Sequence, residues 1–268
     1  MAQDKKAGSY TATEQMVASA AREIRDGDVI YVGVGLPTLA TWLAKYTHAP
    51  HCTVVHEVGI IRTTPCPLGQ YQDALPVHFM SDALAGLVYV NALAQRGFVN
   101  KGFIGAGQID RYGNVNDNAV GDYLKPVHRW NGSGGANDVM SFCNKVIIIL
   151  KQSKRRFLEK VDFITCPGYL DGKPGRREEY GLRPDTGPST VITDLGTYRF
   201  ENREMTLTSV HTDIGVTLED IKAEIGWDLK ISSDLGESEP PTEEELYILR
   251  EKVDPTNIFV DGKYATPE

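Results

Sequence analysis

The sequence is poor in cysteine, and its cysteines show no pairing by spacing. It has 4 cysteines in 268 residues, none in a C-x-x-C spacing, and each lies in or beside an apolar run: Cys52, Cys66, Cys143 and Cys166. Disulfide frameworks are typical of small, loop-rich secreted domains. We therefore expect reduced thiols in a cytosol.

Positive charge is also scarce. Lys and Arg number 28 against 36 Asp and Glu, which gives a formal net charge of -8 and a pI near 5.3. Nucleic acids and anionic membranes attract basic surfaces, so neither is expected as a partner. An anionic substrate would have to be met by local positive charge or by backbone N–H groups.

Long apolar runs, low-complexity tracts and internal repeats are missing as well. No run approaches the roughly 20 apolar residues that span a bilayer, and the polar start MAQDKKAGSY lacks the apolar segment of an export signal. With 41% hydrophobic and 24% charged residues, the composition is that of an ordinary globular protein. We expect one soluble cytoplasmic domain over residues 1–268, with its ordered core at about 7–260.

The chain does contain an alternation of helix and strand patterns. The first pattern predicts a helix over about 14–25 with Thr13 as its N-cap. Buried strands are predicted at 29–32 and 146–150, because consecutive aliphatic residues are typical of strands covered on both faces. Further expected elements are helices at 38–46, 82–96 (packing through Leu84, Val88, Ala92 and Leu93), 217–224 and from Thr242, strands at 52–56, 161–165, 189–193, 196–200 and 205–210, and a long loop over 167–188. This order indicates an α/β domain with a small β-rich section in its C-terminal half.

The strand at 52–56 ends at Glu57, and Gly59 follows shortly after. A β-branched run that ends in an acid places the carboxylate at the carboxyl edge of a sheet, where open α/β folds build their sites. Glu57 is therefore our candidate nucleophile, and the alternative is a solvated loop glutamate. Gly59 is expected to permit the sharp turn that exposes the carboxylate.

Three glycine-rich segments accompany this glutamate. Gly33 and Gly35 stand between a strand and a helix, where free N–H groups suit an anion or a closely approaching backbone. Gly134 and Gly135 lie in a run of glycines whose backbone amides can point inward, and a flexible surface turn is the alternative. The third segment, 105–116, joins a strand edge to a turn.

Four segments stand in an order that resembles the β subunits of class I coenzyme A transferases, in which a Gly-x-Gly-x-Pro loop precedes the Glu-x-Gly that carries the nucleophile. In this sequence they are Gly33 to Pro37, His56 to Gly59, Gly105 to Asp110 with Gly113 and Asn114, and Gly132 to Asn137. The stretches 154–162, 167–172, 187–188 and 191–194 are similar to the glutaconate CoA-transferase branch rather than to the succinyl-CoA:3-ketoacid branch. The resemblance covers about residues 7–260.

This resemblance implies an α/β fold with an open, largely parallel sheet flanked by helices. It also implies that the chain is a β subunit, which needs a separate α subunit to complete the cleft of an αβ hetero-oligomer. The implied reaction exchanges CoA between an acyl-CoA and a free carboxylic acid, through a covalent glutamyl-CoA thioester on Glu57. Because one thioester replaces another, neither ATP nor a metal is required, and coenzyme A is a substrate rather than a cofactor.

Each step of that exchange passes through a tetrahedral oxyanion, so fixed N–H donors are needed near Glu57. Gly134 and Gly135 are the candidates. Gln108 would orient the carboxylate or the bound acyl group, and a loop-capping amide is the alternative. The residues assigned to substrate or CoA binding are Gly33, Gly35, Gly59, Gln108 and Asn116.

Two further groups of side chains lie near these motifs. On a strand, His56 points to the face opposite the candidate nucleophile and is expected to be a packed or interface histidine. Arg62 is a candidate for the second carboxylate of a dicarboxylic acid such as glutaconate. Lys154, Arg155 and Arg156 would meet CoA phosphates, but a basic cluster is more often a solvated face or a subunit contact, so they are left out of the site.

Two other functions fit parts of the pattern. Relatives on the same fold are acyl-CoA decarboxylases, or hydrolases that open a ring in CoA-linked intermediates, and these usually lack the nucleophilic glutamate. Its presence in His-Glu-Val-Gly favours transfer, although Val58 stands where a small polar residue is more usual. In a non-catalytic binding or regulatory subunit, Glu57 would be a sheet-edge residue, and the activity of the complex would survive its replacement by alanine.

Overall fold

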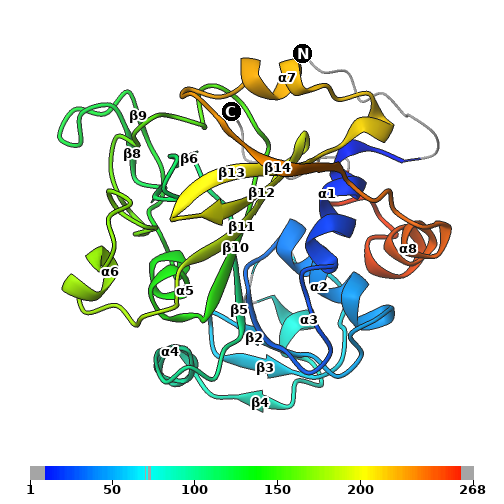
Figure 1. The fold of residues 1–268 in the computed structure, drawn as a ribbon. Coiled ribbons are helices and arrows are strands. Elements are labelled where there is room, and N and C mark those ends of the chain that lie inside the picture. Colours follow the sequence, from blue (N-terminus) through cyan, green and yellow to red (C-terminus); the bar gives the residue numbers. More distant parts are fainter. Residues whose placement is uncertain (1–9, 70, 72–73, 261–268) are drawn as a thin grey trace.

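The computed structural model describes residues 10–69, 71 and 74–260. A ten-stranded sheet runs through the molecule, and helices pack against it (Figure 1). The helices are α1 (Ala12–Ala21), α2 (Leu36–Tyr46), α3 (Leu75–His78), α4 (Leu87–Gln95), α5 (Ala136–Phe142), α6 (Arg176–Glu179), α7 (Leu218–Ala223) and α8 (Glu243–Ile248), with a 3-10 turn η1 (Thr212–Ile214) and a π-helical turn η2 (Leu249–Val253). The strands are β1 (Val29–Val32), β2 (Thr53–His56), β3 (Ile60–Arg62), β4 (Ala83–Leu84), β5 (Lys101–Ile104), β6 (Gln108–Ile109), β7 (Val115–Asn116), β8 (Ala119–Val120), β9 (His128–Arg129), β10 (Lys145–Ile149), β11 (Pro188–Ile192), β12 (Gly196–Glu201), β13 (Glu204–Val210) and β14 (Lys230–Glu237).

The strand order of the main sheet is β14-β13-β12-β11-β10-β5-β1-β2-β3-β4. Its central strands β2, β1, β5, β10 and β11 run parallel. Antiparallel strands extend it on both sides, with β14 again parallel to β13. Two small antiparallel hairpins, β6–β7 and β8–β9, lie outside it. The structure confirms the expected α/β fold with an open, largely parallel sheet and a β-rich C-terminal section, which is formed by β11, β12 and β13.

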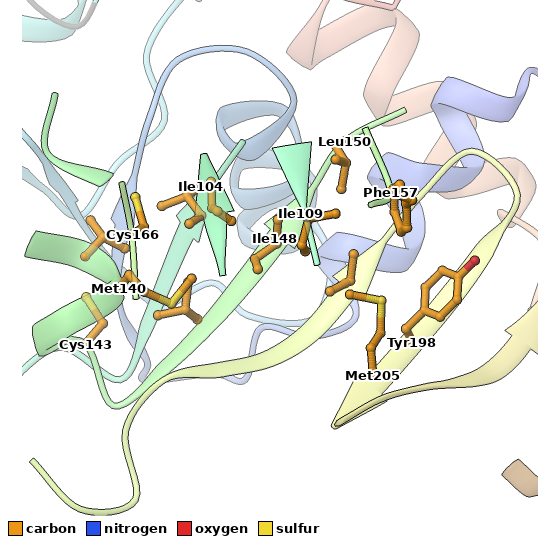
Figure 2. Packing of buried hydrophobic residues seen from close by; sticks show 14 of the residues in the cluster. Ile104, Ile109, Met140, Cys143, Ile148, Leu150, Phe157, Cys166, Tyr198 and Met205 are labelled. Carbon is orange, nitrogen blue, oxygen red and sulfur yellow. The ribbon is translucent and has the colours of Figure 1, made fainter. Parts of the chain in front are cut away.

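Both faces of the central strands are buried, as their aliphatic runs predicted. Along β10, Val146 and Ile148 join one hydrophobic cluster, whereas Ile147 and Ile149 join a second cluster that contains residues of α1 and α2. Successive side chains of a strand point to opposite faces, so the two clusters cover the two faces of the sheet. Figure 2 shows the first cluster, which extends from β10 toward Tyr198 on β12.

The first helix begins earlier than its apolar pattern suggested. α1 starts at Ala12, with Thr11 rather than Thr13 as its N-cap, and it ends at Ala21. Thr11 Oγ1 accepts a hydrogen bond from Glu14 N (3.2 Å), and Glu14 Oε2 accepts one from Thr11 N (2.7 Å). This reciprocal pair is a capping box, which satisfies two backbone amides that the helix leaves free. The spacing from Thr11 to Glu14 therefore sets the start of the helix.

The helix expected at 82–96 is shorter and packs through a different face. Residues 83–84 form the edge strand β4, and α4 begins only after Gly86, whose φ is 78°. Val90 and Ala94 are the buried residues of α4, whereas Val88 is 82% exposed. The predicted packing face is wrong, apart from Leu93, which is partly buried: Leu84, Val88 and Ala92 are exposed. The start of α4 instead presents apolar side chains outward.

The C-terminal half differs from the prediction in three places. Residues 161–165 form no strand. β14 is an additional strand, and the loop expected over 167–188 contains the short helix α6. In contrast, α7 and α8 start after Thr217 and Thr242 as predicted, and each of these threonines forms a capping box. No helix in the described part of the chain is long and apolar enough to cross a membrane.

Candidate active site

A cavity of about 510 Å³ opens at the carboxyl ends of the central parallel strands. Its wall includes Val32 at the end of β1, Ile104 at the end of β5 and Ile149 at the end of β10. The segments that follow these strands complete the wall, among them residues 33–34 and 105–107. This is the edge at which open α/β sheets bind their ligands, and the volume is in the usual range for small-molecule pockets.

Glu57 lines this cavity and lies against the glycine pair that precedes α5. A Cβ atom placed on Gly135 would lie 2.8 Å from Cδ of Glu57, and one placed on Gly134 would lie 3.3 Å from its Oε1. The backbone of this turn therefore lies so close to the carboxylate that a side chain at Gly135 would displace it. The fold brings together the three residues that the sequence assigned to catalysis.

The glycine pair stands at a helix start, where backbone N–H groups have no partner within the helix. Gly134 has a φ of 49°, and Gly135 is the N-cap of α5. The turn is closed by hydrogen bonds from Ala136 N to Ser133 O (2.9 Å) and from Val139 N to Gly135 O (2.9 Å). It is thus an ordered turn beside the carboxylate rather than a flexible surface segment.

The backbone conformation and packing at position 59, close to Glu57, require a glycine. Its φ is 99°, and a Cβ atom here would lie 2.3 Å from the backbone of Gly86. Gly59 N donates to His56 O (2.9 Å), and Ala85 N donates to Gly59 O (2.8 Å). The residue therefore makes a tight turn after β2 and joins it to the segment that starts α4, which agrees with the structural role expected for it.

The loop from Gly33 to Pro37 forms one wall of the cavity. Gly33, Val34, Leu36 and Pro37 line it, whereas Gly35 is the N-cap of α2 and faces elsewhere, with the site of its absent Cβ 3.9 Å from Phe259. Because Gly35 has a φ of 94°, a side chain at this position would strain the loop. Gly33 is thus placed to contact a ligand, and Gly35 shapes the loop that carries it.

Gln108 and Asn116 do not line the cavity. Both are buried in the hairpin β6–β7, where Asn116 Nδ2 donates to Gln108 Oε1 (2.6 Å). Gln108 Nε2 in turn donates to Asp162 Oδ2 (2.8 Å). The two amides are used to hold the loops together, so the structure favours the loop-capping alternative and gives neither residue a substrate contact in this cavity.

Two charged residues that the sequence reasoning did not include line the same cavity: Asp117 and Arg156. Asp117 accepts a hydrogen bond from Gly107 N (2.6 Å), and its burial raises the pKa of the carboxyl to about 6. Arg156 is the only Lys, Arg or His among the described residues that form the wall. Its place in a run of three basic residues gave no sign of which one turns inward.

His56 and Arg62 lie away from the cavity. His56 is 3% exposed and packs edge-on to Trp42, with ring centroids 6.4 Å apart; burial, and then the charge of Arg62, lower its pKa to about 4. Arg62 is 2% exposed and donates to the carbonyl oxygens of Val77 (2.7 Å) and Phe79 (2.8 Å). His56 is thus a packed histidine, and the hypothesis that Arg62 binds a substrate carboxylate is wrong.

The buried cysteines are not activated as nucleophiles. Burial raises the pKa of the Cys52 thiol to about 11 and that of Cys143 to about 12, so both stay protonated and weakly nucleophilic at neutral pH. Cys166 is also buried, with a raised pKa. Among the residues that the structure describes, no group of three or more His, Cys, Asp and Glu side chains is arranged to hold a metal ion.

The chain is similar to known proteins over nearly its whole length. A family model described as Coenzyme A transferase matches residues 13–224. A glutaconate CoA-transferase subunit of Acidaminococcus fermentans is 35% identical over 261 residues, which cover 94% of this chain and 96% of that protein. A 3-oxoadipate CoA-transferase subunit of Pseudomonas knackmussii is 37% identical over 253 residues, which cover 90% of this chain and 93% of that protein.

Solved structures share the fold but differ in the chemistry named for them. The crystal structure of glutaconate coenzyme A-transferase from Acidaminococcus fermentans matches with a TM-score of 0.88 at 32% identity, over 96% of this chain and 99% of that chain. The decarboxylase AibA/AibB matches with a TM-score of 0.78 at 26% identity, over 91% of this chain and 95% of that chain. The residues of the site must therefore decide the reaction.

Proposed function

Because the chain belongs to the coenzyme A transferase family, we propose that it is the β subunit of an enzyme that moves CoA between an acyl-CoA and a free carboxylic acid through a covalent thioester on Glu57. The observation that carries this proposal is the position of Glu57. Its carboxylate lines the cavity at the carboxyl edge of the sheet and lies against Gly134 and Gly135. A nucleophilic carboxylate needs this combination of access and nearby backbone donors.

The reaction proceeds as a series of acyl transfers, all of which involve the carboxylate of Glu57. A Glu57 oxygen attacks the thioester carbonyl carbon, the C–S bond breaks, and CoA leaves as its thiolate, so that the acyl group and Glu57 form a mixed anhydride. The thiolate attacks the glutamyl carbonyl carbon, and the first acid leaves as a carboxylate. The second carboxylate then attacks the glutamyl-CoA thioester, and the reverse sequence releases the new acyl-CoA and restores Glu57. No redox step and no net proton transfer occur.

Each attack places negative charge on a carbonyl oxygen. Fixed N–H donors at that position stabilise the transition state, and removing one typically costs about 10²–10³ in rate. We assign this role to the backbone amides of Gly134 and Gly135, because their turn lies directly against the Glu57 carboxylate. The reaction requires no other cofactor, since the CoA thioester is itself the substrate.

The acid exchanged is, in our proposal, a dicarboxylic acid such as glutaconate. Support comes from the relatives named for glutaconate and for 3-oxoadipate, both of which are dicarboxylates. A decarboxylase or a ring-opening hydrolase on the same fold is the second candidate, which the similarity to AibA/AibB keeps open. Glu57 in the cavity wall favours transfer, since only transfer needs a carboxylate that carries CoA. It also disfavours a purely regulatory subunit.

Trapping the covalent intermediate tests this function. We expect borohydride to reduce a glutamyl-CoA thioester in the complex incubated with acyl-CoA, so that the peptide containing Glu57 changes mass and activity is lost. Omitting acyl-CoA, or adding excess free acid to discharge the thioester, should protect the peptide. An unmodified Glu57 in a complex that still consumes acyl-CoA would favour decarboxylation or hydrolysis instead.

We propose that a separate α subunit covers the apolar surface beside this site, in a cytoplasmic αβ hetero-oligomer. The relatives are each named as one lettered subunit of their enzyme, which supports a partner of a second kind. The surface is formed by β4, by the residues that follow α3 and by the start of α4; Figure 1 shows β4 and α4 along the lower edge of the molecule. Its exposed members are Phe79 (71%), Met80 (75%), Leu84 (65%), Leu87 (48%), Val88 (82%) and Tyr89 (54%). Residues 83–95 contain no Asp, Glu, Lys or Arg, and an apolar patch of this kind marks an interaction site.

This apolar surface is continuous with the catalytic glutamate. Val58, next to Glu57, is 37% exposed, and Ala85 N donates to Gly59 O (2.8 Å). Gly59 also lies directly against Gly86, which precedes α4. A partner seated on α4 and β4 would therefore reach the mouth of the cavity, as expected for an α subunit that completes the cleft.

A charge introduced into this surface should prevent assembly. Tyr89→Lys is expected to weaken the αβ complex by about 100-fold or more, because a buried lysine without a partner is strongly destabilising. The matched control is Tyr247→Lys on α8, since Tyr247 is 58% exposed and Tyr89 is 54% exposed. Co-purification with a tagged α subunit and titration by light scattering measure the effect. Equal affinity in the two variants would place the interface elsewhere.

A further inference from the structure

We propose that Arg156 is the residue that selects dicarboxylic substrates, by pairing with the carboxylate at the end remote from Glu57. This inference rests on the proposed function and names the group that sets its substrate class. It replaces Arg62, whose guanidinium is buried and bonded to backbone carbonyls away from the cavity. Arg156 lines the same cavity as Glu57, so one bound molecule can meet both residues.

The backbone at Arg156 is fixed, so its side chain starts from a defined place. Ile109 N donates to Arg156 O (2.7 Å), and Arg156 N donates to Ser153 O (2.8 Å). The next residue, Phe157, is fully buried, with its ring 6.1 Å from that of Trp227. These contacts hold Arg156 beside β6. β6 directly follows the segment 105–107, which also lines the cavity.

The three basic residues of this run have different surroundings. Lys154 and Arg155 are exposed and do not line the cavity, whereas Arg156 is half-buried and does. In the described part of the chain, no side chain is hydrogen-bonded or ion-paired to the Arg156 guanidinium. Burial raises the pKa of Asp194 and the nearby charge of Arg156 opposes that rise, but this half-buried carboxylate accepts its hydrogen bond from Gln152 N (2.7 Å). The Arg156 guanidinium thus keeps its donors for a ligand.

The charges of the cavity show why such a group is needed. Its described ionisable lining residues, tyrosine aside, are two acids, Glu57 and Asp117, and one base, Arg156. Burial raises the pKa of Asp117 to about 6, because desolvation at its position disfavours the charged form. A dicarboxylic acyl group leaves its second carboxylate unreacted, and that charge must be paired when it is buried. A guanidinium meets a carboxylate through two parallel hydrogen bonds, so Arg156 fits this task.

The same guanidinium chemistry would also fit a phosphate of CoA, and the experiment separates the two sources of negative charge. In the αβ complex with acetyl-CoA as donor, kcat/KM is measured for dicarboxylic acceptors of four to six carbons and for monocarboxylic acids of the same lengths. The variants are Arg156→Gln, Arg156→Lys and the matched control Arg155→Gln, which removes a neighbouring exposed charge.

We expect Arg156→Gln to lower kcat/KM for dicarboxylic acceptors by about 10- to 100-fold, mainly through KM, because hydrogen bonds to charged groups contribute most of such selectivity. Rates with monocarboxylic acids and the KM for acetyl-CoA should stay the same, Arg156→Lys should recover part of the loss, and Arg155→Gln should match the wild type. An equal loss with both classes of acid together with a raised KM for acetyl-CoA would assign Arg156 to CoA and overturn the proposal. A wild type that prefers monocarboxylic acids would also overturn it while leaving transfer through Glu57 intact. Failure of transfer itself would appear separately, as no activity with any acid and no trapped Glu57.

Discussion

Replacing Glu57 with glutamine is expected to abolish CoA transfer while the complex still assembles. The amide has nearly the same shape as the carboxylate, so the contacts with Gly134 and Gly135 can persist. It cannot form the mixed anhydride, because it has no free nucleophilic oxygen. Loss of a covalent nucleophile leaves only the rate due to binding and electrostatic stabilisation, so we expect a drop in kcat of about 10⁴-fold or more.

Glu57→Asp, which keeps the carboxylate on a shorter side chain, is expected to lose less activity than Glu57→Gln. The nucleophile is retained but retracted by one methylene group, and a misplacement of about 1 Å can cost about 10² in rate. Glu201→Gln is a suitable control, since it removes an exposed carboxylate at the end of β12, which runs antiparallel to β11 and therefore ends at the edge of the sheet opposite the cavity. Initial rates of acyl-CoA exchange measure the series. Full exchange by Glu57→Gln would show that this carboxylate carries no CoA and would overturn the role proposed for Glu57.

Gly135→Ala is expected to reduce transfer by about 10²-fold with little loss of fold stability. The added methyl group would lie 2.8 Å from Cδ of Glu57, so the carboxylate must move. The backbone of Gly135 has φ -80° and ψ -2°, which alanine adopts without strain. The damage is therefore confined to the position of the nucleophile, and a shift of about 1 Å is enough for this loss.

The matched control for this variant is Gly236→Ala on β14. No atom lies within 4 Å of the methyl group it adds, and its φ is outside the left-handed region. Thermal unfolding of both variants separates stability from catalysis, and borohydride trapping shows how much thioester each still forms. A Gly135→Ala complex with wild-type kcat and normal trapping would remove the glycine pair from the mechanism.

Local patterns in the sequence were sufficient for the longer helices and for several strands of the main sheet. The aliphatic run at 146–150 fixed a strand buried on both faces, because such residues leave no polar face for solvent. Thr217 and Thr242 marked two helix starts, since a threonine side chain can cap the amides that follow it. For α1, the residues of the capping box at Thr11 are present in the sequence, but the prediction placed the N-cap at Thr13.

The sequence by itself also identified Glu57 and the glycines before α5 as candidates for the site, through the order in which their motifs occur along the chain. Tertiary structure alone decided which side chains share the cavity. Arg156 lines it beside β6, where Ile109 N donates a hydrogen bond to the carbonyl oxygen of Arg156. Arg62 is excluded because carbonyl oxygens at the end of α3 accept its hydrogen bonds. These choices depend on contacts between segments far apart in the chain, which no local pattern encodes. The same holds for α4, whose outward apolar face follows from how Val90 and Ala94 pack against the core.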